Sequence, residues 1–321
     1  MHLVGTTASG RLMHTYRRPD TLSNQAGTWT PFVDVETTAK GGIDRGLFNL
    51  GDVSCAQTTP PFNIADLHIC AVNNTGQVWH VIRNKTFGSD TIGDWTEMGS
   101  VESQAGNVGP HRRISCSLHN TSGLHVVTTS KNGEAVWHTI RRPNRTWFPF
   151  GAVYGQTGKP GNAYDVAAAV DGDELHVCIA TDTGNLLHTI RREGDGSWLP
   201  FGSVLDQVGH GFKNKAVNAR RLSAWAGGGM LRLWVVTAAG DLIMTLRHPN
   251  GRWAPWTDEP AWYTNVPSDI ATFGIHGWGE HKAITTNVGG LYHQLLPIGS
   301  GDVEGQAGQA GEFRSVAISG G

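Results

Sequence analysis

The residues best suited to chemistry in this sequence recur at nearly fixed spacing. The stretch from Leu186 to Val204, LLHTIRREGDGSWLPFGSV, holds a histidine, a threonine, two arginines and a tryptophan, and related copies begin at residues 10, 76, 133, 240 and 289. A catalytic centre needs one constellation that its neighbours lack. Because these side chains are repeated, the pattern favours a scaffold or a multivalent binder over an enzyme.

Strand alternation divides each copy into two faces. One face carries Leu186, His188 and Ile190 and is mostly apolar. We therefore expect the histidine to be a core residue that donates a hydrogen bond to the backbone of a neighbouring repeat. Its replacement by Met244 in the fifth copy favours packing over chemistry. The histidines of different copies should point away from any common centre, so no metal site and no cofactor are expected.

The other face places arginine and threonine beside a tryptophan of the adjacent strand. This pair can be structural, but an indole can also cover the C–H face of a sugar while a guanidinium donates to its hydroxyls. We predict no catalytic residue. The carbohydrate-binding candidates, including glutamines of a Gln-x-Gly linker, are Trp29, Trp79, Trp95, Trp137, Trp147, Trp198, Trp253, Arg17, Arg83, Arg141, Arg191, Arg247, Thr15, Thr139, Thr189, Gln104, Gln156 and Gln207.

The copies belong to larger units of four strands. An alternating strand such as LHVCIA precedes each copy across a short turn that contains glycine, and a strand of small residues precedes that one. The small-residue strands begin at residues 53, 114, 166, 222, 270 and 316, a spacing typical of four-stranded propeller blades. The sequence therefore predicts an all-β, six-bladed β-propeller.

The chain starts at the second strand of a unit and ends after an isolated first strand, so the C-terminal strand should pair with the N-terminal three strands and close the propeller. We predict a single β-propeller domain over residues 1–321. Its blades are blade 1 at residues 1–36 plus 312–321, blade 2 at 50–101, blade 3 at 111–153, blade 4 at 163–204, blade 5 at 219–258 and blade 6 at 268–305.

Composition limits the partners. The net charge is −2, so no overall field would attract nucleic acid, and the N-terminus shows neither a signal peptide nor a membrane anchor. We expect no membrane insertion, and cytoplasmic residence or release by a non-classical route. The four cysteines lie in apolar runs and are expected to be buried thiols, with Cys55 and Cys70 the one pair to check for a disulfide.

The combined signature of WHTIR, then W-x-PFG-x-V, then GQ-x-G resembles the repeats of the Photorhabdus fucose-binding (PLL-type) lectins over essentially the whole chain. That resemblance implies a non-enzymatic β-propeller that binds L-fucose and related or O-methylated sugars in clefts between blades and that often oligomerises. The best-known members have seven blades, whereas this sequence has six units. The clefts around blades 3 and 4 are the first candidates, because both units keep the linker glutamine, at Gln156 and Gln207.

Two other functions remain open. A protein-interaction propeller would bind through variable loops on one face, and a glycoside hydrolase would need a unique carboxylate, which the sequence does not display. The sugar, the occupied clefts, the oligomeric state and the biological partner are not encoded in the pattern.

Overall fold

The computed structural model describes residues 1–17, 27–39, 48–58, 66–84, 93–213, 215–259, 262–275, 279–296 and 299–319. The chain forms two compact units. The first comprises residues 1–101 and 262–321, and the second comprises residues 102–261. Each unit contains three four-stranded antiparallel sheets, so the predicted six-bladed, all-β propeller of four-stranded blades is confirmed. The assignment of the whole chain to a single domain stays a prediction.

The first unit holds blades 1, 2 and 6, whose strand orders are β26-β1-β2-β3, β4-β5-β6-β7 and β22-β23-β24-β25. Its strands are β1 (His2–Thr7), β2 (Leu12–Tyr16), β3 (Val33–Asp34), β4 (Leu50–Gln57), β5 (Leu67–Asn73), β6 (Val78–Arg83), β7 (Gly99–Ser100), β22 (Pro267–Ile275), β23 (Gly279–Thr286), β24 (Leu291–Leu296), β25 (Gly299–Asp302) and β26 (Phe313–Ser319).

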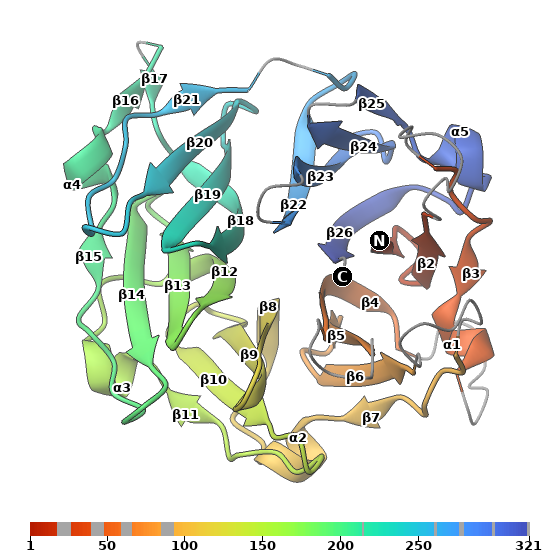
Figure 1. Ribbon diagram of the computed structural model, residues 1–321, viewed down its shortest axis with the longest axis horizontal. Helices are drawn as coiled ribbons and strands as arrows, with labels where there is room; N and C mark the ends of the chain where they lie inside the picture. The colour runs from red at the N-terminus through yellow and green to blue at the C-terminus, as the bar shows by residue number, and fades with distance from the viewer. Residues whose placement is uncertain are drawn as a thin grey trace. The chain divides into compact units, whose positions relative to one another are not determined.

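The second unit holds blades 3, 4 and 5, each built in sequence order from its inner to its outer strand. Its strands are β8 (His111–His119), β9 (Gly123–Ser130), β10 (Val136–Arg141), β11 (Gly151–Ala152), β12 (Ala163–Asp171), β13 (Glu174–Thr181), β14 (Leu186–Arg192), β15 (Gly202–Ser203), β18 (Ala219–Gly227), β19 (Met230–Thr237), β20 (Leu242–Arg247) and β21 (Thr257–Asp258). A separate hairpin, β16 (Gly211–Phe212) with β17 (Lys215–Ala216), precedes blade 5. Within this unit the inner strands β8, β12 and β18 are neighbours (Figure 1).

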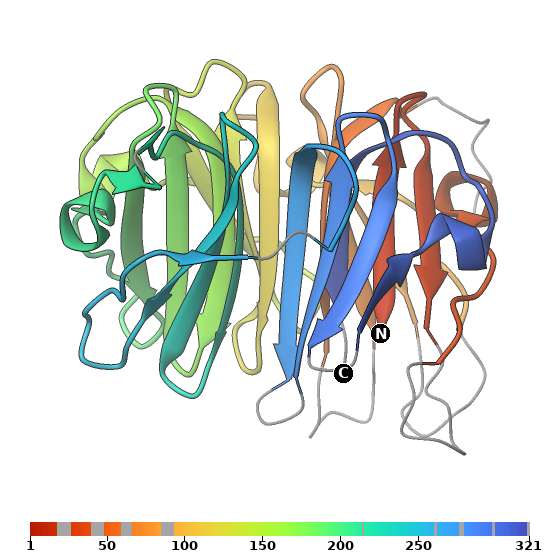
Figure 2. The same cartoon turned by 90° about the horizontal axis from the view of Figure 1, so that it is seen from above.

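Blade 1 is closed by strands from the two ends of the chain, as the sequence predicts. Strand β26 pairs antiparallel with β1, and Leu3 lies opposite Ile318. Figure 2 shows these two strands side by side in the first unit. The backbone edge of β1 is therefore covered by β26, which removes an exposed template for strand addition.

The fourth strand of most blades is shorter than the sequence suggested. The repeated tryptophan does not open it. Trp198 instead makes an isolated bridge to Arg191, and the ladder resumes where Ser203 pairs with Leu187. Pro200 stands between the two pairings, but blade 2 has the same interruption between Trp95 and Gly99 without a proline, so proline is not its cause.

A single helical turn follows the fourth strand in five blades. These turns are α1 (Val35–Thr38), α2 (Glu102–Ala105), α3 (Tyr154–Thr157), α4 (Leu205–Val208) and α5 (Glu304–Ala307). The Gln-x-Gly linker of the sequence is the end of such a turn. Gly158 stops α3 with φ of 81° and donates its N–H to the Tyr154 carbonyl. In the second unit α3 and α4 lie beside β11 and β15, away from the inner strands (Figure 1).

Polar side chains of the inner strands connect neighbouring blades. Asp165 accepts from the Leu222 N–H at 2.7 Å, and Ser115 accepts from the Ala168 N–H at 2.9 Å. A register shift in β12 between Ala163 and Asp165 accompanies the first contact. These bonds pair inner-strand donors that point toward the next blade rather than along the sheet.

The small residues predicted for the inner strands are buried, as Ala167 and Ala169 show at 2% and 4% exposure. All four cysteines are buried and described, and none forms a disulfide, Cys55 and Cys70 included. None of the helices in the described part of the chain has the length and apolar character needed to cross a lipid bilayer.

Candidate functional site

The repeated arginine and tryptophan face each other across adjacent strands, as predicted. In five blades they form an isolated bridge, and the pairs are Arg17 with Trp29, Arg83 with Trp95, Arg141 with Trp147, Arg191 with Trp198 and Arg247 with Trp253. The Arg83 guanidinium lies 5.2 Å from the Trp95 ring centre, within cation–π range. Its Nε also donates to the Gly93 carbonyl at 3.3 Å, so the arginine helps to shape the turn before the tryptophan.

Four of these pairs meet the histidine face of a neighbouring blade in the same unit. The ring centre of His138 in blade 3 lies 5.4 Å from that of Trp198 in blade 4, edge to face. His188 makes the same contact with Trp253 of blade 5, again at 5.4 Å. In the first unit, His14 contacts Trp95 at 5.2 Å. The two faces assigned from the sequence therefore come together in the clefts between neighbouring blades.

The expectation that this histidine bonds to a neighbouring backbone is wrong. Its partner is a second histidine on the adjacent strand of its own blade. His176 Nδ1 and His188 Nε2 are 3.0 Å apart, with the rings stacked at 5.3 Å. Comparable pairs are His2 with His14, His68 with His80, His125 with His138 and His281 with His293. The second histidine lies in the alternating strand that precedes each copy, such as His176 in LHVCIA. Alternation within one strand does not show which residue lies opposite it on the next strand.

The arginine of the next blade fixes the protonation of such a pair. Arg83 Nη1 lies 3.1 Å from His14 Nδ1, and a guanidinium can only donate. His14 Nδ1 must therefore accept, and its proton resides on Nε2. That nitrogen in turn donates to His2 Nδ1 at 2.9 Å. Both rings are consequently neutral in this arrangement.

Burial keeps these histidines neutral. Desolvation lowers the pKa of His125 and of His176 from 6.5 to about 4. It holds the pKa of His138 and His188 well below 6.5, and the neighbouring histidine of each pair lowers these further. Burying a neutral imidazole in the cleft wall costs less free energy than burying an imidazolium would.

The cleft between blades 3 and 4 is open enough to hold a small ligand. It has a volume of about 170 Å³ and is lined by His138, Thr139, Ile140, Phe148, Pro149, Gly151, Gln156, Arg191, Gly196 and Trp198. Four predicted residues meet here: Thr139 of β10, Gln156 of α3, Arg191 of β14, and Trp198. The cleft combines an indole, a guanidinium and an amide with apolar walls, a combination that fits an amphipathic ring bearing hydroxyl groups.

An acidic residue that was not among the predicted site residues orients the cleft arginine. Glu193 accepts from Arg191 Nη1 at 2.5 Å, and its carboxylate also lies 3.3 Å from His125 Nε2. Both side chains are largely buried, at 15% and 8% exposure. Blade 4 has an acid two positions after the cleft arginine, whereas blades 3 and 5 have Pro143 and Pro249 there. That difference between the copies is the feature of the sequence that could have identified Glu193.

The predicted threonines are buried and already hydrogen-bonded, so their role in sugar contact stays a prediction. Thr15, Thr139 and Thr189 are 0–1% exposed. Their hydroxyls donate to the carbonyls of Thr30, Phe148 and Leu199 at 2.5 Å. These bonds hold the segment that follows the repeated tryptophan against the third strand. The threonine side chains are buried because they point into the packed interior of the blade.

The remaining candidates lie elsewhere. Gln104 and Gln207 are exposed on α2 and α4. Trp79 packs on Phe48 with ring centres 4.3 Å apart, and Trp137 lines a separate groove of blade 3. Trp29 of blade 1 contacts His293 of blade 6 at 5.2 Å, with Arg17 Nη1 3.5 Å from the same ring. Among the described residues, no group of three or more His, Cys, Asp or Glu could hold a metal ion.

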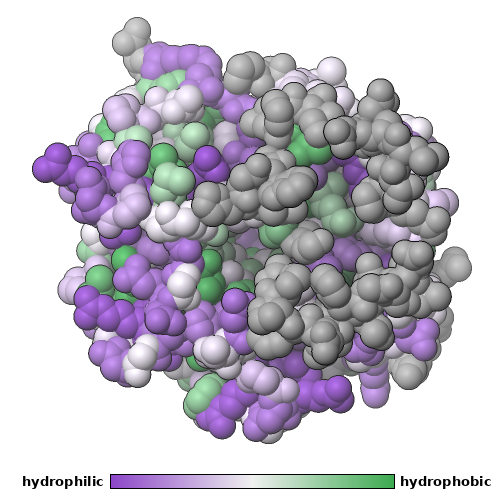
Figure 3. All heavy atoms as spheres, viewed as in Figure 1, coloured by the Kyte–Doolittle hydropathy of each residue, from purple (hydrophilic) through white to green (hydrophobic). Residues whose placement is uncertain are grey.

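Exposed apolar side chains are few. On the face shown in Figure 3 the described residues are mostly hydrophilic, with hydrophobic ones in small separate groups. Phe148, at the edge of the cleft, is 40% exposed and is one of three large hydrophobic residues classed as exposed in the described part of the chain. The Arg142 guanidinium covers its ring at 3.5 Å.

The six four-stranded sheets define a six-bladed β-propeller. Solved structures of this class include a variant of the Aleuria aurantia lectin in complex with Fucα1-6GlcNAc. It has 12% sequence identity and a TM-score of 0.63, and the match covers 94% of this chain and 89% of that chain. AofleA from Arthrobotrys oligospora has 12% identity and a TM-score of 0.61, and the match covers 99% of this chain and 86% of that chain.

A further Aleuria aurantia structure is described as a six-bladed β-propeller with a novel fucose recognition mode. It has 13% identity and a TM-score of 0.58, and the match covers 93% of this chain and 92% of that chain. At these identities the likeness shows a shared fold. No protein-family model and no curated protein sequence matches the chain.

Proposed function

We propose that this chain is a carbohydrate-binding protein, a non-enzymatic lectin of the PLL type, that takes a fucose-like or O-methylated sugar in the cleft between blades 3 and 4. The observation that carries the proposal is the meeting of Trp198, Arg191 and Gln156 in one cleft with an apolar wall. The fold it shares with lectins described as fucose-specific adds support.

The chemistry of the cleft favours a sugar with one apolar face. The Trp198 indole can stack on C–H groups, and an apolar substituent such as a methyl group can contact Phe148 and Pro149. The Arg191 fork, held by Glu193, offers N–H donors in a fixed geometry to neighbouring hydroxyls. A cleft of about 170 Å³ suits a single ring and is smaller than the usual pocket for drug-sized molecules.

Multivalency follows from the repetition. Five blades carry the Arg–Trp bridge, so several weak sites on one chain would bind a glycan-covered surface with avidity. The side chains available for binding differ between blades. Blade 4 adds Glu193, whereas blade 6 has no arginine in its third strand and no tryptophan after it. We expect unequal affinities, with the cleft between blades 3 and 4 among the strongest. Assembly into a homo-oligomer belongs to the same proposal.

Replacing the cleft arginine tests the proposal. L-fucose, α-methyl-L-fucoside and an O-methylated monosaccharide are titrated into the full chain by calorimetry and by thermal melting. Binding to the folded state should raise the melting temperature. Arg191→Ala should weaken binding at its cleft about tenfold to a hundredfold, because a charge-assisted hydrogen bond contributes roughly 1.5–3 kcal/mol.

The matched control is Arg192→Ala, which removes an exposed guanidinium from the next position of the same strand, on its other face. This control should bind as the wild type does. Absence of binding to all three sugars and to a broad glycan array at millimolar site concentrations would refute the lectin function. Equal losses in the two variants would instead refute the assignment of the cleft.

A further inference from the structure

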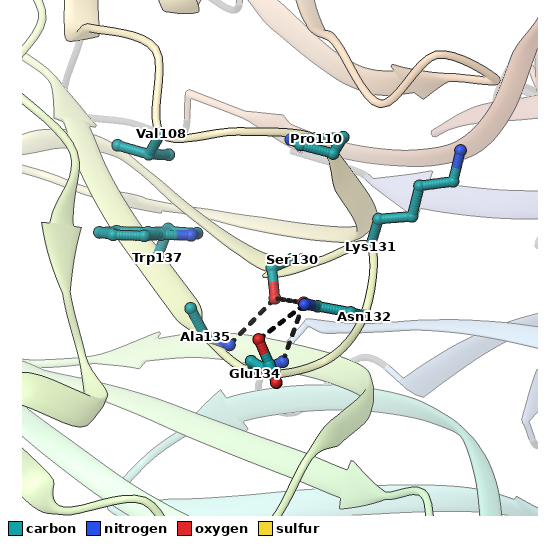
Figure 4. Close-up of a pocket in the computed structure, with 8 residues that line it drawn as sticks. All are labelled: Val108, Pro110, Ser130, Lys131, Asn132, Glu134, Ala135 and Trp137. Carbon is teal, nitrogen blue, oxygen red and sulfur yellow. Dashed lines mark hydrogen bonds between the residues drawn. The ribbon is translucent and has the colours of Figure 1, made fainter.

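A second pocket lies in blade 3, separate from the cleft that blade 3 shares with blade 4. It has a volume of about 500 Å³, and its lining residues are Val108, Pro110, Ser130, Lys131, Asn132, Glu134, Ala135 and Trp137 (Figure 4). All eight belong to the second unit, and none lines the first cleft. Trp137 and His138 are consecutive in β10, so they point to opposite faces of the sheet and serve the two pockets separately.

The fold does not require a tryptophan at this place. The residue that pairs with the second position of the fourth strand is Trp137 in blade 3, but it is Leu187 in blade 4 and Ile243 in blade 5. These two aliphatic side chains are 9% and 0% exposed. In blade 2 the matching Trp79 is covered by Phe48. In blade 3 the indole is half-buried and borders open space.

Figure 4 shows how the lining side chains divide around this space. Val108 lies over one flat face of Trp137, Pro110 lies farther along the same side, and the turn between β9 and β10 lies on the other side. The indole Nε1 makes no hydrogen bond with any described residue, so it can donate to a ligand. The half-buried indole thus offers part of its ring and a polar N–H edge to the pocket.

The polar side of the pocket is preorganised. Ser130 Oγ donates to Asn132 Oδ1 at 2.9 Å, and Asn132 Nδ2 donates to Glu134 Oε2 at 2.7 Å (Figure 4). The Glu134 N–H also donates to Asn132 Oδ1 at 3.2 Å. These bonds hold the Glu134 carboxylate at the pocket while leaving its second oxygen able to accept, which lowers the entropic cost of binding.

The charges indicate a neutral ligand. Glu134 and Lys131 contribute one negative and one positive group, so neither an anion nor a cation gains a net electrostatic advantage. Acceptors and donors beside an aromatic plane match a polyhydroxylated ring. The pocket is also about three times as large as the cleft between blades 3 and 4, with volumes of about 500 and 170 Å³.

We propose that this pocket of blade 3 is a second carbohydrate subsite, which stacks one sugar ring on Trp137, bonds its hydroxyls to Glu134 and Lys131, and has room for an attached residue. The subsite rests on the proposed lectin function but uses none of the residues of the first cleft. It therefore predicts binding that survives loss of Arg191 and that favours an oligosaccharide over a monosaccharide.

The test follows the indole N–H signals of the isotope-labelled full chain by NMR during titration. The probes are α-methyl-L-fucoside and the disaccharide Fucα1-6GlcNAc, and the signals of Trp137 and Trp198 are assigned from the variants Trp137→Leu and Trp198→Phe. Leucine is the residue that blade 4 carries at the position of Trp137, so this variant should fold, which its melting curve checks. The wild-type titration gives a result even if a variant does not fold.

We expect the disaccharide to shift the Trp137 signal with a dissociation constant of its own. Trp137→Leu should abolish that binding phase and leave the Trp198 shift unchanged, whereas Arg191→Ala should do the reverse. A Trp198 shift with no Trp137 response to either probe would overturn the second subsite and leave the proposed function standing. Absence of any shift at both tryptophans would overturn both, and a Trp137 shift alone would support the subsite and remove the first cleft.

Discussion

At the scale of single residues, each cleft depends on a histidine that must remain neutral. His138 forms one wall of the cleft between blades 3 and 4 and is bonded to His125 behind it. Arg191 lines the same cleft, and the Glu193 carboxylate lies 3.3 Å from His125 Nε2, so a proton added to His125 would meet repulsion from Arg191 and attraction from Glu193. Burial is the larger influence on the pKa of His125, and it opposes protonation.

Acid should therefore destabilise the fold within a defined range of pH. The unfolded chain binds protons at these histidines from about pH 6.5 downward, whereas in the folded chain burial lowers the pKa of His125 and His176 to about 4. Stability is complete above pH 6.5 and falls as the pH decreases toward 4, by on the order of 3 kcal/mol for each such group. Urea unfolding at half-unit steps between pH 8 and 4.5 measures the slope.

The matched control removes one pair completely. Blade 5 carries Arg232 and Met244 where blade 4 has His176 and His188, so a blade can form without the pair. The double variant His176→Leu/His188→Met should lower the dependence of the unfolding free energy on pH by up to two protons. Replacing both partners avoids leaving one buried polar ring unsatisfied. A wild-type unfolding free energy that stays constant from pH 6.5 to 5 would contradict the explanation.

The sequence predicted which side chains meet at the cleft better than it predicted what each one does. The Arg–Trp juxtaposition and the presence of Gln156 follow from strand alternation and linker position, which are local properties. The histidine pairs and Glu193 depend on cross-strand register and on contacts between side chains of neighbouring blades, which a single repeat does not contain. The burial of the threonines was not predicted either, because sharing a strand face with Arg191 did not imply sharing its exposure.

At the scale of elements, the glycine in the turn between the second and third strands sets the spacing of neighbouring blades. Gly289 has φ of 83°, and a Cβ placed on it would lie 2.7 Å from the Glu312 Cα at the approach to β26. Gly133 would similarly bring a Cβ to 2.6 Å from the Ala163 carbonyl oxygen at the start of β12. The repeated glycine therefore provides both a left-handed turn and a close approach to the next inner strand.

Gly289 and Gly308 both have a positive φ but differ in the space around an added Cβ. Gly308, at the end of α5, has φ of 84°, and a Cβ added to it would have no described atom within 4 Å. Gly308→Ala should cost about 1–3 kcal/mol, because φ of 84° with ψ of 157° is a region essentially confined to glycine. Gly289→Ala should add roughly 1–3 kcal/mol to its own positive-φ penalty, because Glu312 must shift. Urea unfolding of the two variants measures the difference, and equal costs would show that blade spacing does not depend on this contact.

At the scale of the whole molecule, the repeats were sufficient to predict six blades of four strands and the origin of the strand that completes blade 1. The periodicity, the glycine turns and the small-residue strands specify this architecture, because every blade repeats the same arrangement of four strands. The short fourth strands and the inner-strand contacts of Asp165 and Ser115 were not predicted. The Asp165 contact accompanies a register shift in β12, and both inner-strand contacts join residues of different blades, which a single repeat does not contain.

Closure by β26 leads to a prediction about chain connectivity. Phe313, Val316 and Ile318 are 2–5% exposed, and burying three such side chains stabilises a fold by roughly 5 kcal/mol or more. Ser315 donates to Asp52 of blade 2 at 3.0 Å, and Val316 donates to Asp269 of blade 6 at 3.0 Å, so β26 also connects blade 1 to its neighbours in the first unit. The contribution is comparable to the total stability of many domains.

Removing residues 312–321 should therefore lower the melting temperature sharply and promote aggregation through the uncovered edge of β1. A circular permutant that starts at Gly311, continues from Gly321 into Met1 and ends at Ala310 should fold and melt within a few degrees of the wild type. Its new connection is short, since Ser319 already lies opposite His2. Melting curves and size-exclusion chromatography compare the three chains. The permutant is the control, because it keeps every strand and changes only the order in which the strands are joined. A truncated chain that stays monomeric and melts at the wild-type temperature would show that blade 1 does not need β26.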